Sequence, residues 1–200
     1  MELNQAMEDG FISYHTRPDG ERYFTNADMA RMVARGLIDP EDRWELIRGA
    51  WFDMGSEGFE HMTARTRIVR TVIEQMVGRN DVEISTEASI FLSHDTEVRP
   101  DVVIYRADVS SNEMTGDDMS LVIEIMKTSQ RRDRELKLPV YAAAGVPEVW
   151  LVDLDGKTVE VCRAPDTAAA AYAKTATAAF TEALSPGAFP SVSLRVSDLL

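Results

Sequence analysis

The stretch LVIEIM, residues 121–126, places one acidic residue inside an otherwise hydrophobic run. A run of this kind is typical of a buried β-strand. An ionised carboxylate in such a place lowers stability by several kcal/mol unless a cation or hydrogen bonds compensate it. Glu124 is therefore expected to have a specific partner.

A second carboxylate opens the preceding hydrophobic run, RPDVVIY, residues 99–105. Two strands that each present one acid make a simple site for a divalent cation. We therefore predict a metal site that contains Asp101 and Glu124. Two other interpretations remain open, because Asp101 could bond to a turn at the start of its strand and Glu124 could face water.

Composition limits the class of protein. The chain has 200 residues, 44% of them hydrophobic, which suits one domain at 24–200 preceded by an N-terminal extension at 1–23. Its net charge of -13 is unusual for a protein that binds nucleic acid, although a local basic groove would be sufficient. The single cysteine, Cys162, excludes an internal disulfide and favours a reducing, cytoplasmic location. No hydrophobic stretch approaches the roughly 20 residues that span a bilayer, so we expect no membrane partner.

Hydrophobic periodicity and turn residues predict the order of the elements. Helices are predicted over 25–36, 61–78 and 130–144. Strands are predicted within 44–54 on both sides of Arg48-Gly49, and at 82–92, 98–105, 121–126, 149–153, 158–162 and 168–183. Asp155-Gly156 is a strong signal for a two-residue hairpin turn. This order predicts a mixed α/β fold in which helices flank a central mixed sheet.

A longer series of motifs resembles the Uma-type restriction endonuclease family, within the PD-(D/E)xK nuclease superfamily. The series runs from MARMVARGLIDPEDRWELIRGAWFDM, residues 29–54, through His61 and RPDVVIY to AFPSVSLRVSDLL at 188–200. Its most specific part is LVIEIMKTSQRRDRELKLPVYAAAGVPEVWLVD, residues 121–153. Because the motifs appear in family order over most of the chain, the resemblance is much stronger than a single Pro-Asp pair.

The resemblance implies a restriction-endonuclease-like fold and a metal-dependent DNA endonuclease that hydrolyses phosphodiester bonds. It assigns Mg²⁺ or Mn²⁺ to Asp101 and Glu124, with the backbone carbonyl of Ile125 completing the inner shell. Glu45 matches an early, outer acid of many relatives, although it could also be a surface charge of a hairpin. The expected partners are DNA and a second copy of the chain in a homodimer.

The catalytic lysine departs from the superfamily pattern. Met126 stands two residues after Glu124, and Lys127 comes one residue too late, on the opposite face of a strand. The family usually carries its lysine on the following helix, where the matching residue is Lys137. Asp133, Lys137 and Tyr141 are spaced to lie along one helical face. Pro139 complicates this assignment, because a proline inside a helix tends to kink it.

A second function remains open beside the nuclease. The acidic charge and the displaced lysine favour a non-catalytic interaction protein that keeps the nuclease fold, whereas Asp101 and Glu124 favour the enzyme. His61 is more often a helix-start residue than a ligand. Arg65, Arg67 and Arg70 on the same predicted helix are usually a solvated face, with DNA contact as the alternative.

Overall fold

A computed structural model describes residues 14–39, 41–110, 114–127 and 133–200. The chain divides into two compact units. One takes the described residues up to Ser56 together with Phe91–Val98, and the other takes Glu57–Ile90 and Arg99–Leu200. The prediction of one domain over 24–200, after an extension at 1–23, stays a prediction. None of the described helices is long and hydrophobic enough to cross a membrane.

In its described residues, the first unit contains the helix α2 (Asn26–Ala34) and small antiparallel sheets. Thr25 caps α2 in a reciprocal capping box with Asp28, which confirms the predicted helix start. The predicted hairpin is confirmed as well, because Arg48 and Gly49 both adopt positive φ angles, of 51° and 75°, between its strands. The strands are β1 (His15–Thr16), β2 (Arg22–Tyr23), β3 (Trp44–Ile47), β4 (Ala50–Asp53), β6 (Ile90–Ser93) and β7 (Thr96–Val98).

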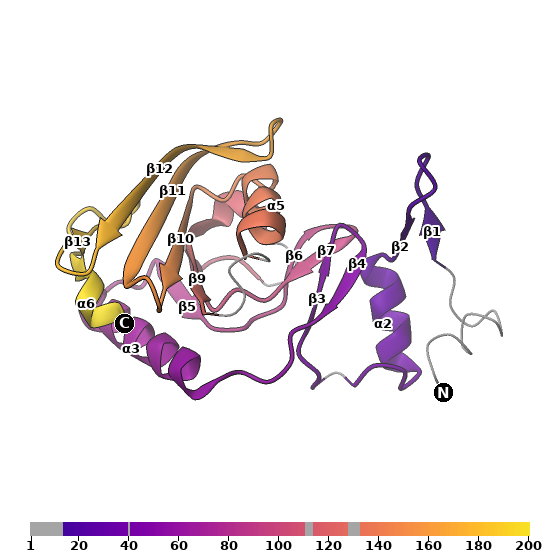
Figure 1. Cartoon of the computed structure of the whole chain (residues 1–200), viewed down its shortest axis with the longest axis horizontal. Helices are drawn as coiled ribbons and strands as arrows, with labels where there is room; N and C mark the ends of the chain where they lie inside the picture. The colour runs from indigo at the N-terminus through magenta and orange to yellow at the C-terminus, as the bar shows by residue number, and fades with distance from the viewer. Residues whose placement is uncertain (1–13, 40, 111–113, 128–132) are drawn as a thin grey trace. The chain divides into compact units, whose positions relative to one another are not determined.

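The second unit is organised around a six-stranded sheet with the order β12-β11-β10-β9-β8-β5 (Figure 1). Its β9 and β10 are parallel, while the other neighbours are antiparallel. The expected mixed central sheet is therefore confirmed. The strands are β5 (Val82–Ser85), β8 (Val102–Arg106), β9 (Met119–Met126), β10 (Glu148–Asp153), β11 (Thr158–Asp166) and β12 (Ala171–Ala179).

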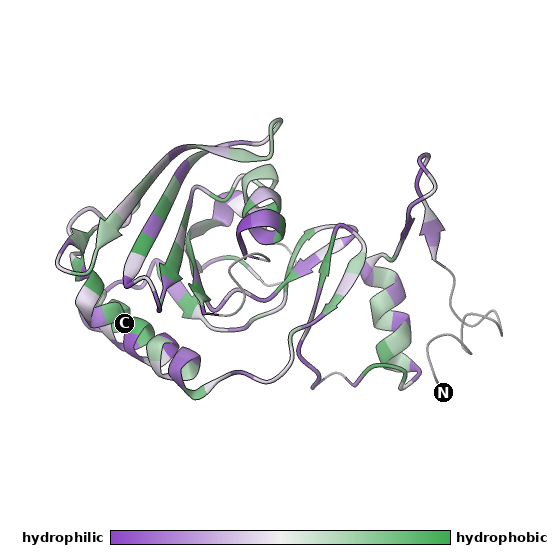
Figure 2. Cartoon of the chain, viewed as in Figure 1, coloured by the Kyte–Doolittle hydropathy of each residue, from purple (hydrophilic) through white to green (hydrophobic). Residues whose placement is uncertain are grey.

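Helices cover both faces of this sheet. The helices α3 (Phe59–Gln75) and α6 (Val196–Leu199) pack on the face that carries Ile123 and Ile125. Figure 2 shows α3 banded between hydrophobic and hydrophilic residues, as expected of a helix with one buried face. Because side chains alternate along a strand, Glu124 points to the other face, where α5 (Leu138–Ala143) lies.

Some elements differ in detail from the sequence prediction. The turn between β10 and β11 is longer than two residues, since Asp153 pairs with Thr158 and the Asp153 carboxylate accepts the backbone N–H groups of Asp155 and Gly156. The helix predicted at 130–144 consists of a π-helical turn at Asp133–Lys137 followed by α5, while residues 128–132 lie outside the described part of the chain. The alanine-rich stretch forms β12, as predicted.

Candidate functional site

Neighbouring strands bring the two predicted acids to the same level of the sheet. Val102 of β8 pairs with Ile123 of β9 in an antiparallel register. Asp101 directly precedes Val102 and Glu124 directly follows Ile123, so both acids adjoin this last pair of the ladder. Both acids are nearly inaccessible to solvent, with 7% of Asp101 and 2% of Glu124 exposed. The pairing of β8 with β9 therefore brings two buried acids to the same end of these neighbouring strands.

Two residues that follow β9 in the sequence, Lys137 and Tyr141, contact the Glu124 carboxylate. Lys137 Nζ lies 2.6 Å from Glu124 Oε1, and the Tyr141 hydroxyl donates a hydrogen bond of 2.5 Å to the same oxygen. Lys137 is itself only 1% exposed. An ion pair buried this deeply is tolerated only when the charges compensate each other closely. The structure thus brings together Glu124, Lys137 and Tyr141 of the sequence prediction.

The local backbone explains how Lys137 reaches this position despite the proline. Pro139 lies in the first turn of α5, the part of a helix where proline is best tolerated. The wider π-helical turn ends at Lys137, immediately before α5 begins. The kink expected at Pro139 is therefore taken up by a change of helix type, and Lys137 and Tyr141 still point the same way.

The second lysine candidate lies in a different environment. Lys127 follows the end of β9 and forms an ion pair with Glu60 on α3. Its side chain is 37% exposed, whereas that of Lys137 is 1% exposed. Of the two lysines, Lys137 is the one that contacts Glu124.

Asp101 is held by backbone and side-chain donors. The backbone N–H of Ile125 donates a hydrogen bond of 2.7 Å to Asp101 Oδ2. The same oxygen lies 3.2 Å from His61 Nε2, and the other carboxylate oxygen lies 3.8 Å from an Arg65 nitrogen. These contacts fix the orientation of the carboxylate beside the strand that carries Glu124.

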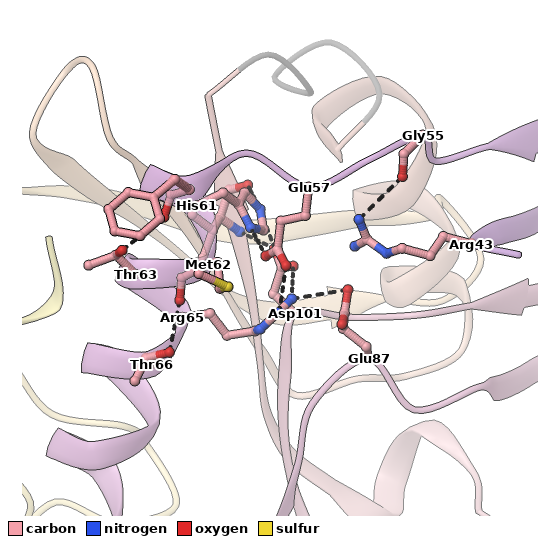
Figure 3. A network of polar contacts seen from close by, with 12 residues as sticks. Arg43, Gly55, Glu57, His61, Met62, Thr63, Arg65, Thr66, Glu87 and Asp101 are labelled. Carbon is pink, nitrogen blue, oxygen red and sulfur yellow. Dashed lines mark hydrogen bonds and ion pairs between the residues drawn. The ribbon is translucent and has the colours of Figure 1, made fainter. Parts of the chain in front are cut away.

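His61 connects Asp101 to a wider network of charges (Figure 3). Its Nδ1 lies 2.6 Å from Glu57 Oε1, and its Nε2 lies 2.9 Å from the Ile125 carbonyl oxygen. Burial lowers the pKa of His61, but the hydrogen bond and charge of Asp101, reinforced by Glu57, outweigh this and raise the pKa to about 9. His61 is therefore an imidazolium at neutral pH.

Arg65 completes this network on the next turn of α3. One of its nitrogens lies 2.7 Å from Glu57 and another lies 3.0 Å from Glu87. Its side chain is only 13% exposed, so Arg65 does not belong to a solvated face of the helix. Glu57 and Arg65 were not predicted as site residues. The four-residue spacing of His61 and Arg65 was a usable signal that they share a helical face, whereas Glu57 lies before the start of α3.

The donor atoms of this region suit a divalent cation. Ligand atoms of Glu57, His61 and Asp101 lie within 4.8 Å of one another. The Ile125 carbonyl oxygen, predicted to complete the inner shell, is directed to the same place because it accepts from His61. Carboxylate and carbonyl oxygens are the usual ligands of Mg²⁺ and Mn²⁺. In the metal-free protein, the positive charges of His61 and Lys137 compensate the negative charges of Asp101 and Glu124.

Glu45 lies in the first unit, and its side chain is completely buried in β3. The alternative of an exposed hairpin charge therefore does not apply. Its assignment as an outer acid of the site stays a prediction.

Comparisons with known proteins agree with this architecture. Residues 28–197 match the Uma2 family, which is described as "Putative restriction endonuclease". A crystal structure of "a putative nuclease belonging to DUF820" from Anabaena variabilis is similar, with a TM-score of 0.70 and 18% sequence identity. The similarity covers 88% of this chain and 97% of that protein, and at this identity it establishes the fold alone. No curated protein matches the chain.

Proposed function

The chain belongs to the Uma2 family, and from this premise we propose that it is a metal-dependent DNA endonuclease that hydrolyses phosphodiester bonds. The observation that carries the proposal is the pairing of β8 with β9. Asp101 and Glu124 both adjoin the last pair of this ladder, Val102 with Ile123, and the Glu124 carboxylate contacts the buried Lys137. Two acids and a lysine in this order of elements are the composition of a PD-(D/E)xK-type site.

We assign the metal to Asp101, Glu124 and the backbone carbonyl of Ile125, with Mg²⁺ or Mn²⁺ as the ion. The chemistry of the donors supports this, because two buried carboxylates and a carbonyl are hard oxygen ligands. When bound, the ion would polarise the scissile phosphate and lower the pKa of a water molecule. The backbone N–H of Ile125, which binds Asp101, keeps that carboxylate directed toward the strand end.

The remaining roles follow from charge and position. Lys137 supplies a positive charge in a water-poor site, where it offsets negative charge that develops on the phosphate and orients the attacking water. Tyr141 is a positioning residue, because its hydroxyl fixes one oxygen of Glu124. We retain Glu45 as an outer acid on the strength of its family position.

DNA is the proposed substrate, and a homodimer is the proposed assembly. The net charge of -13 opposes broad electrostatic attraction to DNA and favours the second candidate, a non-catalytic interaction protein with the same fold. A nuclease with this charge has to rely on local contacts and on the metal. Because few cationic contacts to the phosphates are then involved, we expect cleavage to depend only weakly on the salt concentration.

Cleavage of supercoiled plasmid, linear DNA and single-stranded DNA tests the proposal. We expect nicking or linearisation with Mg²⁺ or Mn²⁺ and none with EDTA. Glu124→Ala and Lys137→Ala should abolish cleavage, while Lys127→Ala should retain it, because Lys127 pairs with Glu60 instead. Equal activity in wild type and Glu124→Ala would indicate a contaminating nuclease. Folded, metal-bound protein that cleaves none of the substrates would support the non-catalytic function.

A further inference from the structure

One nitrogen of His61 lies between two atoms that we assign to the metal. Nε2 is 2.9 Å from the Ile125 carbonyl oxygen and 3.2 Å from Asp101 Oδ2. Because a carbonyl oxygen only accepts hydrogen bonds, Nε2 now carries a hydrogen directed at this pair of oxygens. The Nε2–H group of His61 thus lies beside both oxygens that we assign to the metal.

The separations of Nε2 from the two oxygens match those of ligands around one ion. Two ligands at right angles, each about 2.1 Å from the ion, lie roughly 3 Å apart. The distances from Nε2 to the two oxygens, 2.9 Å and 3.2 Å, fall at this value. Each of these oxygens is therefore close enough to Nε2 to share one cation with it.

Glu57 gives His61 the support that metal-bound histidines usually have. Its carboxylate oxygen lies 2.6 Å from Nδ1, which must therefore carry the other ring hydrogen. A carboxylate on the far nitrogen fixes the orientation of the ring and makes the near nitrogen a better ligand. An Arg65 nitrogen in turn lies 2.7 Å from a Glu57 carboxylate oxygen, and this ion pair fixes the position of Glu57.

We propose that His61 is a further ligand of the metal centre through Nε2, and that Glu57 orients it. The inference rests on the proposed metal site at Asp101 and adds a nitrogen to its oxygen donors. Coordination replaces the Nε2 hydrogen by the ion, and the proton leaves to solvent. Because imidazole favours transition metals over Mg²⁺, this ligand shifts the preference of the site from Mg²⁺ towards transition-metal ions such as Mn²⁺.

Pulsed electron paramagnetic resonance with Mn²⁺ alone tests the proposal on the full chain. A coordinated imidazole produces a ¹⁴N coupling to the Mn²⁺ spin, and we expect one in the wild type. His61→Gln should lose the coupling and bind Mn²⁺ roughly tenfold or more weakly, and its preference for Mn²⁺ over Mg²⁺ should fall. His94→Gln is the matched control, because His94 has a largely exposed side chain and should leave coupling and affinity unchanged.

Glu57→Gln provides an independent variant in case His61→Gln does not fold. It should retain the ¹⁴N coupling and weaken Mn²⁺ binding about 10-fold to 100-fold. The proposal is overturned if wild-type protein binds Mn²⁺ without the coupling, if the coupling persists in His61→Gln, or if Mn²⁺ does not bind. Cleavage without a ¹⁴N coupling would overturn the role of His61 alone, and a coupling without cleavage would overturn the nuclease alone.

Discussion

The burial of Glu124 is tolerable because one of its oxygens receives both an ammonium and a hydroxyl group. Each partner removes part of the cost of taking the carboxylate out of water. Lys137 depends on Glu124 in the same way, since it is 1% exposed. A pair of this kind is strongly coupled, and loss of either member leaves an uncompensated charge.

Lys137→Met should therefore destabilise the metal-free protein by about 3–5 kcal/mol, because Glu124 is left buried and charged. Adding Glu124→Gln should recover much of this loss, since the double variant buries no net charge at this position. Chemical denaturation measures the free energy of unfolding of all three proteins. Lys127→Met is the control and should change it by about 1 kcal/mol or less, as expected for an exposed pair. Equal losses at both lysines would contradict the account.

His61 makes the stability of the metal-free protein depend on pH. Its pKa in the folded protein is about 9, above the ordinary 6.5, so folding favours the protonated ring. The stabilisation is fully present below pH 6.5 and is lost as the pH rises through about 9. Unfolding titrations from pH 6 to 10 should show this decline in the wild type and a smaller decline in His61→Gln. Identical pH profiles would mean that His61 contributes nothing.

Helices and strands with a clear hydrophobic periodicity could be predicted from the sequence, whereas features that depend on packing could not. The repeat of hydrophobic residues in α3 and the runs of β8 and β9 located these elements, and Glu124 itself pointed to a site. The network around His61 was not predictable, because its contact with Ile125 joins residues 64 positions apart. The change from π-helix to α-helix before Pro139 likewise depends on how the helix packs.

Gly116 allows two segments of the second unit to approach each other closely. A Cβ atom at this position would lie 1.9 Å from the Ala144 carbonyl oxygen at the end of α5. Gly116→Ala should therefore destabilise the protein by about 1–3 kcal/mol, because backbone atoms have to move apart. Gly58→Ala is the matched control, since a Cβ there meets no atom within 4 Å. It should cost about 1 kcal/mol or less, because Gly58 is the N-cap of α3 and alanine is less favourable there. Denaturant midpoints of the two variants distinguish these outcomes, and equal effects would contradict the close approach.

For the whole molecule, the acids that surround the proposed centre should make folding depend on divalent cations. An ion that binds only the native state raises the melting temperature in proportion to the logarithm of its concentration. Mg²⁺ or Mn²⁺ should therefore stabilise the wild type and have a much smaller effect on an Asp101→Ala, Glu124→Ala double variant. Thermal melts with and without metal measure the shift. An equal shift in both proteins would mean that the ion binds elsewhere on this acidic chain.

The most direct test of the central claim is the position of a bound ion. Anomalous diffraction from crystals grown with Mn²⁺ locates the metal without reference to activity. The account predicts a peak about 2.0–2.5 Å from a carboxylate oxygen of Asp101, from one of Glu124 and from the Ile125 carbonyl oxygen. A peak that contacts neither acid, or crystals saturated with Mn²⁺ that have no peak beside Asp101 and Glu124, would contradict it.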